Sequence, residues 1–157
     1  MARLVSWPTL DDADLKFFSG TATYAAMITV AAAHVGADRR VLLDLGEVQN
    51  LARVRINGRD LGVLWKPPFV VDATSSLKVG ANALEVEVTN TWRNRLIGDS
   101  GKPLAERATW TLGNVTLPAI SPLLPAGLLG PVRLVTEVRV VAGAPSVRKE
   151  GRRRGDT

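Results

Sequence analysis

The side chains best suited to chemistry gather in one short stretch near the middle of the chain. Residues 89–99 hold one tryptophan, two arginines, two asparagines and one aspartate within eleven positions. An indole face stacks on the C–H groups of a sugar, while guanidinium, amide and carboxylate groups hydrogen-bond its hydroxyls. Such a mixture on a loop is typical of a binding site. We therefore predict sugar contacts from Trp92, Arg93, Asn94, Arg95 and Asp99.

Two further candidate sugar contacts, Trp65 and Lys66, lie at the end of a predicted strand and before a Pro-Pro pair. Trp65 has the same strand parity as Leu61 and Val63, so burial in the core is an equally good interpretation of this indole. Trp110 alternates with an apolar neighbour, and we expect it in the core.

Each polar candidate also has a structural interpretation. Arg95 and Asp99 can pair to hold the segment in place, and Asn94 can hydrogen-bond loop backbone groups. Trp92 is the best stacking candidate, although burial beneath the loop is nearly as good an interpretation.

Catalytic residues are not expected anywhere in the chain. Glycoside hydrolysis needs two carboxylates across a scissile bond. Glu85 and Glu87 share one strand face, but a solvated or docked sheet face explains them better. Asp99 with Glu106 lacks a partner for acid–base work, and His34 stands without a nucleophile motif.

Metal and thiol chemistry is limited by composition. The chain has no cysteine and one histidine, which excludes disulfides, thiolate metal sites and a histidine cluster. We expect no cofactor. A structural calcium ion bound by carboxylates such as Asp44, Asp72 or Asp99 is a weaker alternative.

The elements that position these residues are predicted to be strands. Val41 to Leu45 and Ala83 to Thr89 alternate apolar and polar residues, and Asn57-Gly58 marks a hairpin turn. Further strands are predicted at 21–30, 53–56, 60–65, 69–72, 108–112 and 132–140, with a loop at 113–131. About eight antiparallel strands favour an all-β jelly-roll β-sandwich.

Length and charge fit one domain followed by a tail. The chain has 157 residues and a net charge of +5. Residues 145–157 carry five basic and two acidic groups, so the body is nearly neutral. We predict a domain over residues 1–144 and a disordered, solubilising tail over 145–157. Nucleic-acid binding through the tail is a minor alternative.

The chain shows neither a signal peptide nor a membrane-spanning run of apolar residues. We therefore expect no membrane partner. The compartment stays open: cytoplasmic if the chain is complete, extracytoplasmic if it is a fragment.

The motifs together resemble a known family. Residues 18–24, 43–48, 54–62, 65–69 and 80–86 are similar to the galactose-binding-like jelly-roll domain of large glycoside hydrolases, including the sugar-binding domain of family 2 enzymes. Residues 62–69, Asn90, Trp92, residues 94–99 and residues 127–132 narrow this to the C-terminal β-sandwich of family 106 α-L-rhamnosidases. The resemblance covers roughly residues 4–141.

This resemblance implies an accessory role, because chemistry in such enzymes belongs to a separate and larger catalytic domain. We expect a carbohydrate-binding module for a rhamnose- or galactose-containing glycan, with no activity alone, or a docking module for the catalytic domain without sugar affinity. An isolated module of this kind also exposes apolar surface, so self-association is a further expectation.

Overall fold

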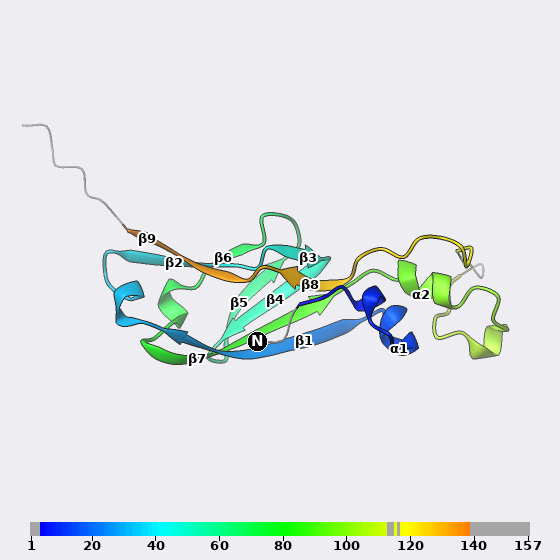
Figure 1. The fold of residues 1–157 in the computed structure, drawn as a ribbon, viewed down its shortest axis with the longest axis horizontal. Coiled ribbons are helices and arrows are strands. Elements are labelled where there is room, and N and C mark those ends of the chain that lie inside the picture. The colour runs from blue at the N-terminus through cyan, green and yellow to red at the C-terminus, as the bar shows by residue number, and fades with distance from the viewer. Residues whose placement is uncertain (1–3, 113–114, 116, 139–157) are drawn as a thin grey trace, which may run out of the picture.

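The computed structural model of the protein describes residues 4–112, 115 and 117–138 and folds them into a β-sandwich (Figure 1). One layer is a four-stranded sheet with the order β1-β7-β4-β5. The second layer combines the sheet β6-β2-β9 with the two-stranded ribbon β3-β8. All these ladders are antiparallel, which confirms the predicted all-β sandwich. None of the helices in the described part is long and apolar enough to cross a bilayer.

The strands are short except for two of ten residues. They are β1 (Thr21–Val30), β2 (Arg39–Asp44), β3 (Glu47–Gln49), β4 (Leu51–Ile56), β5 (Arg59–Leu64), β6 (Val70–Asp72), β7 (Gly80–Thr89), β8 (Gly127–Gly130) and β9 (Arg133–Val138). The helices are single turns or little more: η1 (Trp7–Thr9), α1 (Ala13–Lys16), η2 (Ala32–His34), η3 (Thr74–Ser76), α2 (Arg93–Gly98) and η4 (Leu104–Glu106).

The hairpin between β4 and β5 turns at the predicted pair. Asn57 has φ 52° and Gly58 has φ 80°, the positive values that a two-residue type I′ turn requires. The Asn57 amide also donates to the carbonyl of Ser76 at 2.9 Å and to Oδ1 of the fully buried Asn82 at 2.8 Å. The turn is thereby fixed to the start of β7.

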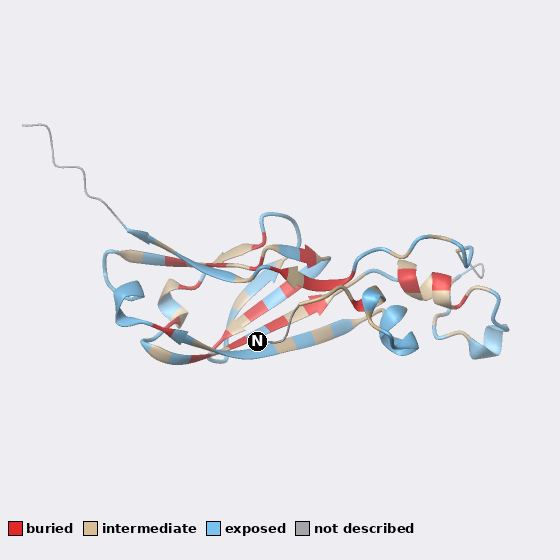
Figure 2. Ribbon diagram, in the orientation of Figure 1, coloured by how far each residue is buried: buried red, intermediate tan, exposed pale blue. Residues whose placement is uncertain are grey.

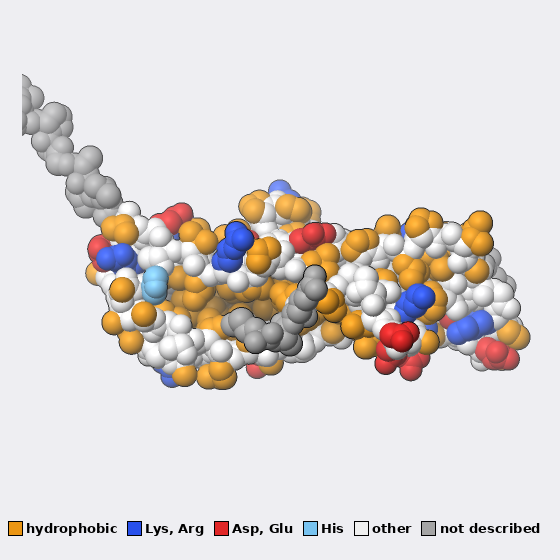
Figure 3. All heavy atoms as spheres, in the orientation of Figure 1, with side chains coloured by type: hydrophobic (Ala, Val, Ile, Leu, Met, Phe, Trp, Pro, Cys, Tyr) orange, Lys and Arg blue, Asp and Glu red, His pale blue; other side chains and the backbone are white. Residues whose placement is uncertain are grey.

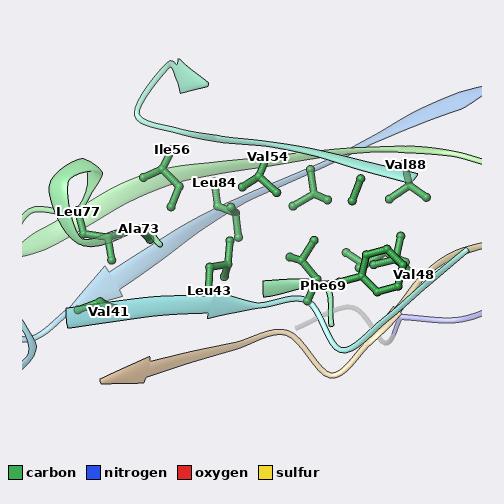
Figure 4. Packing of buried hydrophobic residues seen from close by; sticks show 14 of the residues in the cluster. Val41, Leu43, Val48, Val54, Ile56, Phe69, Ala73, Leu77, Leu84 and Val88 are labelled. Carbon is green, nitrogen blue, oxygen red and sulfur yellow. The ribbon is translucent and has the colours of Figure 1, made fainter. Parts of the chain in front are cut away.

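The core lies between the two layers and follows the predicted alternation. Along β7 the side chains of Leu84, Val86 and Val88 are buried, and those of Glu85 and Glu87 point outward. Figure 4 shows Leu84 and Val54 of one layer facing Leu43 of the other. Burial in Figure 2 is concentrated along these facing strands.

The N-terminal segment closes one end of the core. The Trp7 indole donates to the Tyr24 hydroxyl at 2.7 Å, and the backbone N–H of Leu128 donates to the same oxygen at 3.1 Å. Gly127 lies against this pair with φ 102°. A Cβ there would come within 2.6 Å of the Trp7 Nε1, so the close approach requires glycine.

Several sequence predictions differ from the structure. Residues 108–112 do not form a strand, and the predicted loop over 113–131 contains strand β8. Strand β3 was also not predicted. There are therefore nine strands in the described residues rather than about eight. The predicted end of the last strand at Val140 and the tail over 145–157 lie outside the described residues.

Candidate functional site

The predicted sugar-binding stretch folds as a short helix rather than as an open loop. Helix α2 begins one residue after Trp92, whose carbonyl accepts a hydrogen bond from Leu96 at 2.9 Å. Residues three apart share a helix face, so Asn94 and Ile97 turn inward together and are buried. Gly98 packs against Phe17 so closely that a Cβ would lie 2.6 Å from the ring.

Asn94 uses its amide within the fold. Its Nδ2 donates to the carbonyl of Leu124 at 2.7 Å, and its Oδ1 accepts from the Leu124 backbone N–H at 2.9 Å. The residue is 3% exposed. The structural interpretation of Asn94, hydrogen bonding to loop backbone, is confirmed, whereas its contact with a sugar stays a prediction.

Asp99 is fully buried and holds the following segment. Its Oδ2 accepts the Thr109 N–H at 2.9 Å and the Thr109 hydroxyl at 2.7 Å, and its Oδ1 accepts the Ala108 N–H at 3.2 Å. Burial alone raises the pKa of a carboxyl, but the hydrogen bonds from Thr109 and Ala108 outweigh it and hold the Asp99 pKa below its ordinary value. Among the described residues Lys102, at 4.0 Å, is the ion-pair partner of Asp99, so the predicted pair with Arg95 does not form.

Trp92, Arg93 and Arg95 remain at the surface. Trp92 is 60% exposed, which settles its position against burial beneath the segment. Arg93 is partly buried, and its Nε has no hydrogen-bond partner among the described residues. Neither arginine forms an ion pair within that same part of the chain. The Trp92 indole is therefore available to a ligand or to another protein surface, whereas Arg93 and Arg95 are only partly exposed.

A cleft of about 490 Å³ lies beside the strand ribbon, and Trp65 forms part of its wall. The other lining residues come from two segments of the chain: Gly46, Glu47, Val48, Gln49 and Asn50 from the first, and Pro67 and Phe69 from the second. Trp65 is 67% exposed, so its interpretation as a core residue is wrong. The Lys66 ammonium sits 5.2 Å from the centre of the Trp65 ring, within the range of a cation–π contact.

The chemistry of this cleft suits a polyhydroxylated ligand. An exposed indole offers a stacking face, and the Glu47 carboxylate and Gln49 amide offer hydrogen bonds. Gln49 Nε2 already donates to the Glu47 carboxylate at 3.1 Å, which orients both groups. Sequence reasoning missed Glu47 and Gln49, because three residues of strand are too short for a periodic pattern.

The cleft and helix α2 follow the same end of the four-stranded sheet. Ala52 of β4 pairs with Leu64 on one side and with Val88 on the other. Neighbouring strands are spaced about 4.8 Å apart, and β4 lies between β5 and β7. The end of β5, which precedes Trp65, and the end of β7, which precedes Trp92, are therefore on the order of 10 Å apart. No residue of 92–99 lines the cleft itself, so the sequence candidates divide into two neighbouring surfaces.

Trp110 does not belong to the core, and its predicted burial is wrong. The indole is 69% exposed. Its alternation with Leu112 resembles that of a strand. However, the Thr109 N–H donates to the Asp99 carboxylate, and residues 108–112 pair with no strand in the described structure. Leu112 is 85% exposed as well, so this segment presents an apolar surface.

The carboxylates and the histidine considered for catalysis have structural partners. Glu87 is ion-paired with Arg55, and Glu85 lies 3.9 Å from the same guanidinium. The His34 Nδ1 is 3.0 Å from the Thr136 hydroxyl. These contacts place Glu85 and Glu87 on a salt-bridged sheet face and His34, in the turn η2, beside strand β9.

The carboxylates named as calcium ligands accept hydrogen bonds from other groups of the fold. Asp44 accepts the Gly46 N–H at 2.8 Å. Asp72 accepts from Arg40 Nε at 2.9 Å and from the Thr74 hydroxyl at 2.6 Å. The Thr74 hydroxyl and the Arg40 guanidinium lower the pKa of Asp72 to about 2. Within the described residues no three acidic or histidine side chains gather as a metal site.

Comparison with known proteins places the chain beside glycoside hydrolases. The chain is 39% identical over 154 residues to a putative β-glucuronidase of Formosa agariphila, and the match covers 84% of this chain and 13% of that protein. The structure of a rhamnosidase from Novosphingobium sp. PP1Y matches with a TM-score of 0.79 and 43% identity, over 87% of this chain and 13% of that one. No family model matches the sequence.

A more distant structural match is also to a single part of a large glycosidase. A β-glucuronidase of Bifidobacterium dentium, solved with coumarin-3-O-glucuronide, matches with a TM-score of 0.50 and 32% identity, over 57% of this chain and 15% of that chain. The chain thus corresponds to one β domain of rhamnosidase- and glucuronidase-like glycoside hydrolases, without the rest of the enzyme. It spans 13% of the length of the first two relatives.

Proposed function

We propose that this chain is a non-catalytic carbohydrate-binding accessory module of an α-L-rhamnosidase-like glycoside hydrolase. The observation that carries the proposal is the exposed Trp65 on the wall of a cleft of about 490 Å³ that Glu47 and Gln49 also line. A stacking face beside hydrogen-bonding groups is the arrangement that sugars require. A rhamnose- or galactose-containing glycan is the proposed ligand.

The neighbouring surface extends the proposed binding area. Trp92, Arg93 and Arg95 follow the end of β7, at the same end of the sheet as the cleft. A glycan longer than one sugar can therefore reach them from the cleft. In this arrangement Asn94 and Asp99 position helix α2 and the segment after it, because their side-chain oxygens accept backbone hydrogen bonds.

Calorimetric titration with L-rhamnose, D-galactose and a rhamnose-containing oligosaccharide tests the proposal. We expect saturable heat from the wild-type chain, no heat from Trp65→Ala, and unchanged heat from Trp110→Ala. Trp110 is a matched control because its indole is as exposed as that of Trp65 but lies outside the cleft. A folded chain that gives no heat with any of the three sugars contradicts the proposal.

A second candidate function is docking to the rest of a glycosidase without sugar affinity. It is favoured by the apolar side chains after helix α2: Leu104 is 53% exposed, Leu112 85% and Ile120 94%. In Figure 1 this segment extends beyond the end of the two sheets. Surfaces of this kind mark protein contacts.

Association in trans distinguishes the two functions. The partner is the Novosphingobium rhamnosidase with its matching segment deleted. Docking predicts that the wild-type chain binds this remainder, and that Ile120→Asp with Leu112→Asp weakens binding without changing any sugar heat. Undiminished binding by the double variant would contradict docking through this surface.

A further inference from the structure

Strand β1 has one free side. Within the described residues it pairs with β7 along its whole length and with no strand on its other side. The Gly20 N–H and C=O both face Asn90 on the β7 side. Backbone groups alternate in direction along an antiparallel strand. The N–H and C=O groups of Thr21, Thr23, Ala25, Met27 and Thr29 therefore point to the free side.

This edge lacks the features that normally prevent strand addition. Natural edge strands carry charges, prolines or bulges, or are kept short. Strand β1 has ten residues, none of them charged and none of them proline, and its register with β7 runs without interruption. The opposite edge, β5, differs: its register shifts between Val54 and Arg55, and Asp60 on it is ion-paired with Arg53.

The side chains beside the free edge are apolar and leave space. Met27 is 66% exposed. A hollow of about 230 Å³ lies next to it, lined by Ala25, Ala26, Met27, Ala83, Leu84 and Glu85. Figure 3 shows hydrophobic side chains in a separate groove, between the two layers, on this face of the molecule.

We propose that β1 pairs with β1 of a second copy of this chain, antiparallel and about a two-fold axis at Ala26. The two four-stranded sheets then become one continuous sheet. This register places Thr23 opposite Thr29 and Tyr24 opposite Ile28, each twice by symmetry. Such threonine pairs and aromatic–β-branched pairs stabilise neighbouring strands.

A second copy fits this edge for reasons of charge and shape. No like charges meet along the pairing, although each chain carries a net charge of +5. Met27 of the second copy lies opposite Ala25, the residue beside the hollow. The hydrogen-bonded positions are the odd-numbered ones, whose backbone groups are free. This inference is independent of any sugar affinity.

Sedimentation velocity over a wide concentration range tests the dimer. We expect a concentration-dependent dimer of the wild-type chain, a monomer for Met27→Lys, and an undiminished dimer for Val63→Lys. Val63 is a matched control because it is 53% exposed and lies on the other edge strand. A wild-type chain that stays monomeric throughout, or loss of the dimer in both variants, overturns the proposal.

A single cysteine tests the register, since the natural chain has none. At the two-fold axis the two Ala26 residues form a non-hydrogen-bonded pair with Cα atoms about 4.5 Å apart, a distance that a disulfide spans. We expect Ala26→Cys to form a disulfide-linked dimer under mild oxidation and Val63→Cys to stay unlinked. Equal linking of the two variants, or none at Ala26→Cys, overturns the pairing.

Discussion

Asn94 and Leu124 exchange two hydrogen bonds although they lie thirty positions apart in the sequence. The amide of Asn94 satisfies both backbone groups of Leu124, and this contact closes the long excursion that leaves β7 and returns to β8. The position of helix α2 therefore depends on hydrogen bonds to Leu124, a residue much later in the chain.

Removing the Asn94 amide is expected to destabilise the protein. Asn94→Ala removes two part-buried hydrogen bonds, to the backbone N–H and to the carbonyl of Leu124, which together contribute about 1–3 kcal/mol. Urea denaturation measures the loss. Thr91→Ala, an exposed change just before the same helix, is the control and is expected to stay within about 0.5 kcal/mol of wild type. Equal stability of the two variants would contradict the role of Asn94.

Replacing Asp99 is expected to loosen the segment that it holds. Asp99→Asn keeps the size of the side chain, but the amide has one acceptor oxygen where the carboxylate has two, so it cannot accept both the Ala108 N–H and the Thr109 N–H as Asp99 does. Trypsin then cuts after Arg107 several-fold faster, because cleavage requires local opening. Glu106→Gln is the control in the same segment. Unchanged cleavage of Asp99→Asn would show that the carboxylate does not hold this segment.

Acid sensitivity is expected from Asp72. Its pKa in the folded chain is about 2, below the ordinary 3.8, because Thr74 and Arg40 hydrogen-bond the charged form. A lowered folded-state pKa stabilises the protein above the ordinary value, and this contribution is lost as the pH falls from about 4 toward about 2. Urea midpoints at several pH values follow the loss. Asp72→Asn is expected to be less stable at neutral pH and to lose less stability in that window; identical pH profiles would refute the assignment.

A methyl group at Gly127 is expected to disturb the N-terminal closure of the core. In Gly127→Ala the new Cβ meets Trp7 Nε1 and the Tyr24 hydroxyl, and the backbone keeps a φ of 102° that alanine disfavours. We expect a loss of about 1–3 kcal/mol, measured by thermal unfolding. Gly101→Ala separates the two causes, because its φ of 77° is also positive but its Cβ would meet open space. If both variants lose the same stability, the close approach to Trp7 is unimportant.

The fold was predictable where the pattern is local. The alternation from Leu84 to Val88 and the Asn57-Gly58 turn are each determined by neighbouring residues, and the structure confirms both. Strands β3 and β8 were not predicted because they are short and because each one's hydrogen-bonding partner is the other, about eighty residues away in the sequence. Their presence depends on the completed sandwich rather than on local propensity.

The candidate site was predictable in composition but not in arrangement. Trp65 and Trp110 both alternate with apolar neighbours, yet both indoles are exposed. Alternation predicts which side chains share a face of a strand, but it does not predict whether other parts of the protein cover that face. The cleft could not be inferred, since Glu47 and Trp65 come from separate segments brought together by the fold. Asn94 and Asp99 illustrate the converse: polar side chains in a promising stretch can be engaged by backbone groups.

The ladder between β2 and β9 has a consequence for synthesis of the chain. Leu42 pairs with Val135, so the central strand of one sheet gains its last neighbour only when almost the whole described chain is available. Until then one side of β2 is unsatisfied, and the local hairpin β4–β5 is the element able to form early. On a ribosome the sandwich therefore closes late, and a nascent chain ending before residue 133 has a sheet that chaperones would recognise as incomplete.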